Sequence, residues 1–253
     1  MTDATLQERY EREAAVVERY ANESLWDRRY HERRMAFIKE VVAGVLGEDE
    51  SFLDVGCGTG EYLSWARSVT SGEVHGCDLA EEYCRRAAET APNAIVRQCT
   101  ASSLPYADRS IDVVMCSEVI EHIPYEEQEA VVAELLRVAR HHVVLTTPNR
   151  RSAVRRLGEL VSAEGVRRLD DEVGHIALLT AKELRGLVSQ PGFLVQPVQY
   201  QHTLPPVIGE RLHLGGVVEP AVAVLEKLLG RVSGTSANQL IVVASRVPCA
   251  SLS

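Results

Sequence analysis

Short apolar runs alternate with amphipathic stretches along the middle of the chain. Runs typical of buried strands span 51–56, 72–78, 93–99, 110–117 and 140–148. Helical periodicity fills the intervening segments 60–69, 80–90 and 124–139. Further along, a capping box at 180–183 opens a helix, and strands are expected at 192–200 and 238–247, with another helix near 217–230 between them. This alternation predicts a doubly wound α/β fold with a mostly parallel sheet.

The start of the chain has helical periodicity instead. One apolar stripe runs from Leu6 to Tyr20 and another from Met35 to Leu46, and Gly47 is the expected stop. The charged faces opposite these stripes, including WDRRYHERR at 26–34, are expected to be solvated. We therefore expect a helical cap at 1–48 and an α/β domain at 49–253, with an arginine-rich insertion at 149–176 after the fifth strand.

Composition narrows the class of protein. A chain of 253 residues with 45% hydrophobic content suits one large α/β domain with additions. It contains no apolar stretch of about 18 residues, so no membrane span is expected. The polar, acidic start and the six cysteines without a CxxC pair predict a cytoplasmic protein in a reducing compartment. A net charge of −9 argues against nucleic acid as a partner, and a homodimer is left open.

A glycine-rich turn follows the first predicted strand. DVGCGTG places Asp54, Gly56, Gly58 and Gly60 where a strand gives way to a helix, and Asp78 ends the next strand. Glycine lets a ligand approach the main chain, and an acidic residue at the second strand can accept hydrogen bonds from ribose hydroxyls. The dinucleotide fingerprint GxGxxG fails here in both registers, and the phosphate-binding GxxxxGK[ST] pattern does not occur.

Several ordered segments together resemble the class I S-adenosylmethionine-dependent methyltransferases. They are FLDVGCGTG, Asp78, LPYADRSIDVVMCSEVIEHI and TTPN, and the resemblance covers roughly residues 50–200. It implies a Rossmann-like, seven-stranded sheet whose last strand is antiparallel, which NQLIVVASRV at 238–247 would supply. It also implies S-adenosylmethionine as the cofactor and a small-molecule methyl acceptor as the partner.

The resemblance assigns roles to individual positions. The implied cofactor-binding residues are Asp54, Gly56, Cys57, Gly58, Gly60, Asp78, Leu79, Thr100, Ala101 and Ser117. The first five would hold the methionine end, Asp78 the ribose, and Leu79, Thr100 and Ala101 the adenine. Thr100 departs from the Asp that the family often has there, although its hydroxyl can still accept a hydrogen bond. Ser117 would lie near the sulfonium through its backbone.

Glu118, Glu121 and His122 follow the fourth predicted strand, where ligands bind in open α/β sheets. Three interpretations are open. The residues could support local structure only, or His122 and Glu121 could be catalytic, with His122 accepting the acceptor's proton. Alternatively, E-x-x-E-H with the distant His175 resembles the metal-binding pattern of ubiquinone-pathway O-methyltransferases and small-RNA 2′-O-methyltransferases. The implied metal ligands are Glu118, Glu121, His122 and His175, for Mg²⁺, Mn²⁺ or Zn²⁺.

We therefore predict an S-adenosylmethionine-dependent methyltransferase that methylates a phenolic, catechol-like or sugar hydroxyl of a small molecule. The alternatives are a small-molecule N-methyltransferase, a small-RNA 2′-O-methyltransferase, and a cofactor-binding scaffold without turnover. The arginines of the insertion, from Arg150 to Arg168, either read an anionic group on the acceptor or form a solvated helix face.

Overall fold

The computed structural model describes residues 25–201 and 237–247. Its strands are β1 (Phe52–Val55), β2 (Val74–Asp78), β3 (Ile95–Gln98), β4 (Ile111–Ser117), β5 (Ala139–Pro148), β6 (Phe193–Val195), β7 (Gln199–Gln201) and β8 (Gln239–Arg246). Its helices are α2 (Leu25–Ala43), α3 (Glu61–Val69), α4 (Glu81–Thr90), the 3₁₀ turn η2 (Ile120–His122), α5 (Tyr125–Val138), α6 (Ala153–Val173) and α7 (Ala181–Val188). The stripe from Leu6 to Tyr20 and the helix near 217–230 lie outside the described residues. None of the described helices is both long and apolar enough to cross a membrane.

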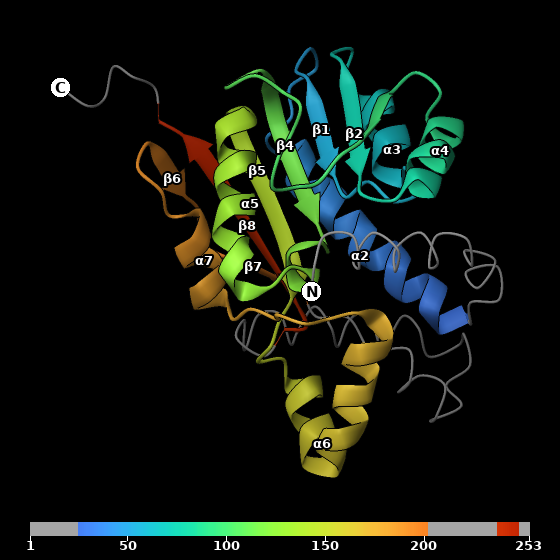
Figure 1. Cartoon of the computed structure of the whole chain (residues 1–253), viewed down its shortest axis with the longest axis vertical. Helices are drawn as coiled ribbons and strands as arrows, with labels where there is room; N and C mark the ends of the chain where they lie inside the picture. Colours follow the sequence, from blue (N-terminus) through green and yellow to red (C-terminus); the bar gives the residue numbers. More distant parts are fainter. Residues whose placement is uncertain (1–24, 202–236, 248–253) are drawn as a thin grey trace.

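The strands form one mixed sheet in the order β3-β2-β1-β4-β5-β8-β6 (Figure 1). The strands from β3 to β5 are parallel, while β8 runs antiparallel to β5 and β6. The predicted doubly wound sheet with an antiparallel strand near the C-terminus is therefore confirmed. The single strand expected at 192–200 is instead two short strands, β6 and β7, both paired with β8. Pro197 lies between them and has no N–H to donate, so the ladder is interrupted there.

Both faces of the sheet are buried, which explains why its strands read as nearly continuous apolar runs. Neighbouring residues of β1 point to opposite faces, so that Leu53 belongs to one hydrophobic cluster and Phe52 to the other. Leu135 of α5 and Leu184 of α7 pack in the cluster of Leu53, and Ile38 of α2 packs in that of Phe52. Helix α2 is thus attached to the domain core by its apolar stripe.

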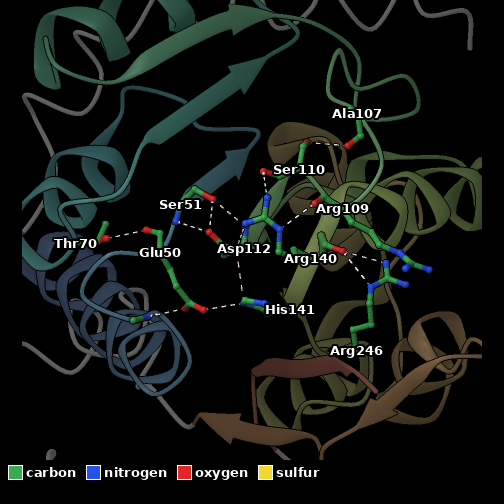
Figure 2. A network of polar contacts seen from close by, with 12 residues as sticks. Glu50, Ser51, Thr70, Ala107, Arg109, Ser110, Asp112, Arg140, His141 and Arg246 are labelled. Atoms are coloured by element: carbon green, nitrogen blue, oxygen red, sulfur yellow. Dashed lines mark hydrogen bonds and ion pairs between the residues drawn. The ribbon is translucent and has the colours of Figure 1, made fainter. Parts of the chain in front are cut away.

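A polar network joins the segments at the amino ends of β1, β4 and β5 (Figure 2). The Asp112 carboxylate accepts hydrogen bonds from the Ser51 N–H at 2.8 Å, the Ser51 hydroxyl at 2.6 Å and the Arg140 guanidinium at 2.6 Å. Nearby, His141 Nδ1 lies 2.7 Å from a Glu50 carboxylate oxygen. Burial alone would raise the pKa of Asp112, but the hydrogen bonds from Ser51 and Arg140 bring it below its usual value. The network therefore connects the amino ends of β1, β4 and β5.

The insertion after β5 is helical. Its helix α6 begins after Ser152, whose hydroxyl accepts a hydrogen bond from the Arg155 N–H. At Ser162 the backbone leaves the helical conformation (φ −160°, ψ 95°), and α6 therefore has two legs (Figure 1). Arg155, before Ser162, connects the two parts of α6 through a bidentate ion pair with Asp170, after it. The end of α6 leads directly to Gly174 and His175.

Candidate functional site

A cleft of about 450 Å³ opens between α2 and the carboxyl ends of the central strands. The lining residues are Arg28, His31, Glu32, Arg34, Met35, Gly56, Cys57, Gly58, Thr59, Glu61, Tyr62, Tyr83, Ser117 and Glu118. The cleft thus brings the glycine turn after β1, the end of β4 and one side of α2 to a common space. This is the edge of the sheet at which ligands bind in open α/β folds.

The glycine turn has the conformation that its sequence requires. Gly56 (φ 78°) and Gly58 (φ 50°) both adopt left-handed backbone conformations that favour glycine. A side chain at Gly56 would collide with Val119, whereas one at Gly58 would meet no described atom within 4 Å. Gly56 is therefore needed for packing, and Gly58 leaves the main chain accessible from the cleft. Gly60 also has a positive φ, of 89°.

Asp54 is buried at the end of β1, with 1% of its surface exposed. Neither of its carboxylate oxygens has a hydrogen-bond partner among the described residues. Burial raises the pKa of Asp54 well above its usual value, and the negative charges of Asp78 and Glu61 raise it further. A buried carboxylate without donors is costly unless a ligand supplies them. Asp54 is thus a candidate to receive donors from a bound molecule.

Asp78 is held at the end of β2 by main-chain donors. Its carboxylate accepts hydrogen bonds from the Gly58 N–H at 3.0 Å and the Ala80 N–H at 3.1 Å. The first bond connects Asp78 to the glycine turn across the two strand ends. An acidic residue at this strand end can accept hydrogen bonds from ribose hydroxyls. Leu79, the next residue, is half-buried.

The remaining residues expected to bind the cofactor follow β1, β3 and β4. The Thr100 hydroxyl lies 3.0 Å from that of Ser102, and Ala101 packs against the hydrophobic core. Ser117 lines the cleft, and its hydroxyl lies 2.9 Å from that of Thr146. Cys57 also lines the cleft, and burial raises the pKa of its thiol, which keeps it protonated.

Glu118 joins three elements around the cleft. Its carboxylate lies 3.0 Å from the Arg34 guanidinium of α2 and accepts a hydrogen bond from the Thr146 hydroxyl of β5, also at 3.0 Å. The Gln239 amide of β8 donates to the same carboxylate. The backbone of Glu118 is left-handed (φ 57°), which is rare for a residue other than glycine.

Glu121, three residues after Glu118, is fully buried. One carboxylate oxygen accepts a hydrogen bond from the Thr147 hydroxyl at 3.1 Å, and the other has no partner within the described part of the chain. Burial raises its pKa well above the usual value, and the charge of Glu118 adds to the rise. Its main-chain carbonyl accepts hydrogen bonds from the N–H groups of Ile176 and Ala177, each at 3.0 Å. These bonds attach the segment after α6 to η2.

Two histidines complete this cluster. His122 Nδ1 lies 3.0 Å from the Gly174 carbonyl, so this nitrogen carries the proton. The ring of His175 lies with its centroid 5.3 Å from that of His122. Burial lowers the pKa of His175 to about 4, and the neighbouring His122 lowers it as well, so His175 is neutral near pH 7.

The structure brings part of the expected metal set together. Ligand atoms of Glu121, His122 and His175 all lie within 4.8 Å of one another. Glu118 is not a member of this group and lies instead against Arg34. A carboxylate oxygen and two imidazoles suit Mn²⁺ or Zn²⁺ best, and Mg²⁺ less well because it prefers oxygen ligands.

Sequence reasoning missed Arg34, Thr147 and Gln239. Arg34 belongs to the charged segment that was expected to be solvated, and that expectation is wrong for this side chain, which lines the cleft and is 24% exposed. Its spacing of four residues from Ile38, a core residue, was the available signal that it lies near the domain. Thr147 and Gln239 belong to strands whose neighbours only the folded sheet defines.

Comparison with known proteins gives the class. Residues 53–147 match the family described as a methyltransferase domain. The structure of magnesium protoporphyrin IX methyltransferase from Synechocystis PCC 6803 with bound S-adenosylhomocysteine has the same fold, with a TM-score of 0.66 at 15% identity, over 97% of this chain and 100% of that one. The chain therefore contains a class I S-adenosylmethionine-dependent methyltransferase domain.

Its curated relatives are distant. The chain is 39% identical to a ubiquinone biosynthesis O-methyltransferase of Idiomarina loihiensis over 97 residues, which are 36% of this chain and 38% of the relative. It is 30% identical to a 27-O-demethylrifamycin SV methyltransferase of Amycolatopsis mediterranei over 111 residues, 41% of this chain and 40% of the relative. The matched segment thus spans less than half the length of either relative.

Proposed function

We propose that this protein transfers a methyl group from S-adenosylmethionine to a hydroxyl group of a small molecule. The observation that carries the proposal is Asp54, a buried carboxylate without donors among the described residues, which comes directly before a glycine turn that lines the cleft. The names of both relatives support an oxygen acceptor, since each describes an O-methyltransferase.

The residues around the cleft fit the parts of this cofactor. The ammonium group of its methionine end would supply the donors that Asp54 lacks, and its carboxylate would find the cation Arg34. The ribose hydroxyls would donate to Asp78, and Leu79, Thr100 and Ala101 would lie along the adenine. The cofactor supplies the reactive methyl group, which a sulfonium carries. The protein's contribution is to place this group in line with the acceptor oxygen, for which alignment can be worth roughly 7–11 kcal/mol.

The cluster after β4 would handle the proton of the acceptor. Because His122 Nδ1 donates to the Gly174 carbonyl, the lone pair of its ring lies on Nε2. A hydroxyl of the acceptor would give its proton to this nitrogen as the oxygen attacks. Glu121, buried beside it, would stabilise the imidazolium that results.

Metal binding is an alternative to this role of His122, because the one lone pair of its neutral ring can bind an ion or accept a proton, but not both. Glu121, His122 and His175 would hold a divalent ion, and the oxygen of Glu121 that lacks a partner is consistent with a ligand there. A bound divalent ion would lower the pKa of an acceptor hydroxyl and orient it. The neutral state of His175 leaves a lone pair for this role.

The first experiment measures S-adenosylhomocysteine binding by calorimetry. We expect the native protein to bind and Asp54→Ala to bind at least tenfold more weakly, because the ammonium loses a buried, charged partner. Asp49→Ala, which removes an exposed carboxylate before β1, is the control and should bind as the native protein does. Absence of binding to the native protein would refute the proposal.

The acceptor is then sought in a panel of phenols, catechols, sugars, amines and short RNA. Transfer from radiolabelled S-adenosylmethionine to a hydroxyl of a small molecule is the expected result. Transfer to an amine or to RNA would identify one of the alternative activities. Binding of the cofactor product without transfer to any of these would support the scaffold.

A further inference from the structure

Glu118 has an unfavourable backbone conformation that its surroundings maintain. Its φ of 57° lies in a region that residues with side chains rarely occupy, and such conformations persist where neighbouring contacts hold them. The Glu118 N–H donates to the Thr146 carbonyl at 3.3 Å, and its carboxylate contacts α2, β5 and β8. A strained backbone with the side chain fixed from three elements indicates a specific task for this carboxylate.

The partner on α2 indicates what that task is. Arg34 Nη1 lies 3.0 Å from Glu118 Oε2, and Arg34 Nη2 lies 3.1 Å from His31 Nδ1. Both Arg34 and Glu118 line the cleft together with Gly56 and Gly58. A guanidinium has five N–H donors, so the two contacts leave donors for an anionic group in the cleft. Without Glu118, the long side chain of Arg34 would be free to adopt many rotamers.

Metal ligation does not account for Glu118. Both oxygens of its carboxylate already have donors, with Arg34 on Oε2 and with Thr146 and Gln239 on Oε1. An ion bound to this carboxylate would have to displace one of these donors and would lie close to the positive charge of Arg34. At this end of the sheet, the ligand atoms of described residues that converge belong to Glu121, His122 and His175.

We propose that Glu118 is a positioning residue that aims Arg34 at the carboxylate end of the bound nucleotide. The inference rests on the proposed function, because it needs a ligand with an amino-acid end in the cleft. Its particular consequence is selective. Loss of Glu118 weakens the binding of ligands that carry the carboxylate and leaves the binding of ligands that lack it unchanged.

Two nucleosides measured by calorimetry test this selectivity. S-adenosylhomocysteine carries the amino-acid end, while 5′-methylthioadenosine has the same adenosine and sulfur without it. We expect Glu118→Gln to weaken S-adenosylhomocysteine about tenfold and to leave 5′-methylthioadenosine within twofold. Arg34→Ala should have the same pattern, and the double variant should bind no more weakly than Arg34→Ala alone.

Glu40→Gln is the matched control, since Glu40 is exposed on the same helix and is not among the residues that line the cleft. It should bind both nucleosides as the native protein does. A Mn²⁺ titration of Glu118→Gln should be identical to that of the native protein. If Glu118→Gln does not fold, Arg34→Ala against the two nucleosides still decides whether Arg34 holds the carboxylate.

The outcomes separate the two proposals. If the native protein binds S-adenosylhomocysteine and Glu118→Gln binds it equally well, only the positioning role is wrong. Equal weakening of both nucleosides would mean that Glu118 supports the fold of the whole cleft, and loss of Mn²⁺ binding in Glu118→Gln would make it a ligand. Either result overturns the inference. A native protein that binds neither nucleoside overturns the proposed function and the inference with it.

Discussion

Two clusters of similar composition lie at opposite ends of the sheet. At the amino ends of the strands are Glu50, Asp112 and His141, and beyond the carboxyl end of β4 are Glu121, His122 and His175. In each cluster, one ligand atom from every residue lies within 4.8 Å of the others. By residue type and spacing alone, the two would be equal candidates for a functional site.

Their hydrogen bonding separates them. Both oxygens of Asp112 accept hydrogen bonds, and its pKa is lowered by Ser51 and Arg140 against the effect of burial (Figure 2). Glu121 retains an oxygen without a described partner, and burial raises its pKa well above the usual value. Satisfied polar groups stabilise a fold, whereas unsatisfied buried ones are maintained where function needs them. The cluster at the amino ends of the strands therefore stabilises the fold, and the cluster after β4 is the candidate site.

The largest expected difference between the clusters is in turnover. Glu121→Gln should slow methyl transfer at least ~100-fold, because proton transfer by positioned groups typically contributes this much or more. Affinity for S-adenosylhomocysteine should change little, since the charged groups proposed to hold the cofactor lie at the ends of β1 and β2 or belong to α2, whereas Glu121 belongs to η2. Initial rates with the acceptor from the panel, set beside calorimetry, measure both. Glu50→Gln in the other cluster should keep the native rate, and equal rates for both variants would contradict the assignment.

Much of this architecture is encoded locally and could be predicted from the sequence. The strands were predictable because strands buried on both faces are apolar throughout, as in FLDV of β1. The turn from Asp54 to Gly60 was predictable because left-handed glycines and a strand end are local properties. The positions of Glu121 and His122 at the site followed from the rule that ligands bind at the carboxyl ends of strands.

The contacts of Glu118 beside the candidate site are not local. Arg34 and Glu118 are 84 residues apart, and Gln239 is 121 residues from Glu118. No periodicity predicts such pairs, so Arg34 was assigned to a solvated face and its contact with Glu118 was not predicted. The split of 192–200 into β6 and β7 has a local signal in Pro197, although the partner strand β8 decides where pairing resumes.

The next largest effect is on stability. Asp112→Ala should lower the free energy of unfolding by about 2 kcal/mol, because it leaves the Ser51 N–H and the Arg140 guanidinium without their acceptor. Glu121→Gln should lower it by less, or raise it, since the substitution removes a buried acid whose charge is poorly compensated. Urea unfolding of both variants, compared with the native protein, checks the order. A larger loss of unfolding free energy for Glu121→Gln would mean that the cluster after β4 also stabilises the fold.

The smallest effect, taken per pH unit, is a difference in pH dependence between buried acids at the two ends of the sheet. The folded pKa of Asp112 is lowered, so its contribution to stability is present above its unfolded pKa of about 3.9 and is lost as the pH falls through the folded value. The folded pKa of Asp54 is raised, so its contribution to stability is fully present below about pH 3.9 and is lost as the pH rises toward the folded value. The loss is at most ~1.4 kcal/mol per pH unit for one group.

Asparagine variants make these opposite slopes visible. Relative to the native protein, Asp54→Asn should gain stability as the pH rises from 4. In the native protein, the buried Asp54 must either ionise or keep a proton that the unfolded chain releases, and both cost free energy. Asp112→Asn should be less stable than the native protein at neutral pH, and the difference should shrink as the pH is lowered below about 4. Urea unfolding between about pH 3.5 and 8, without cofactor, measures both differences. Slopes of the same sign would show that Asp54 has donors in the folded protein, and the contrast between the two ends of the sheet would then disappear.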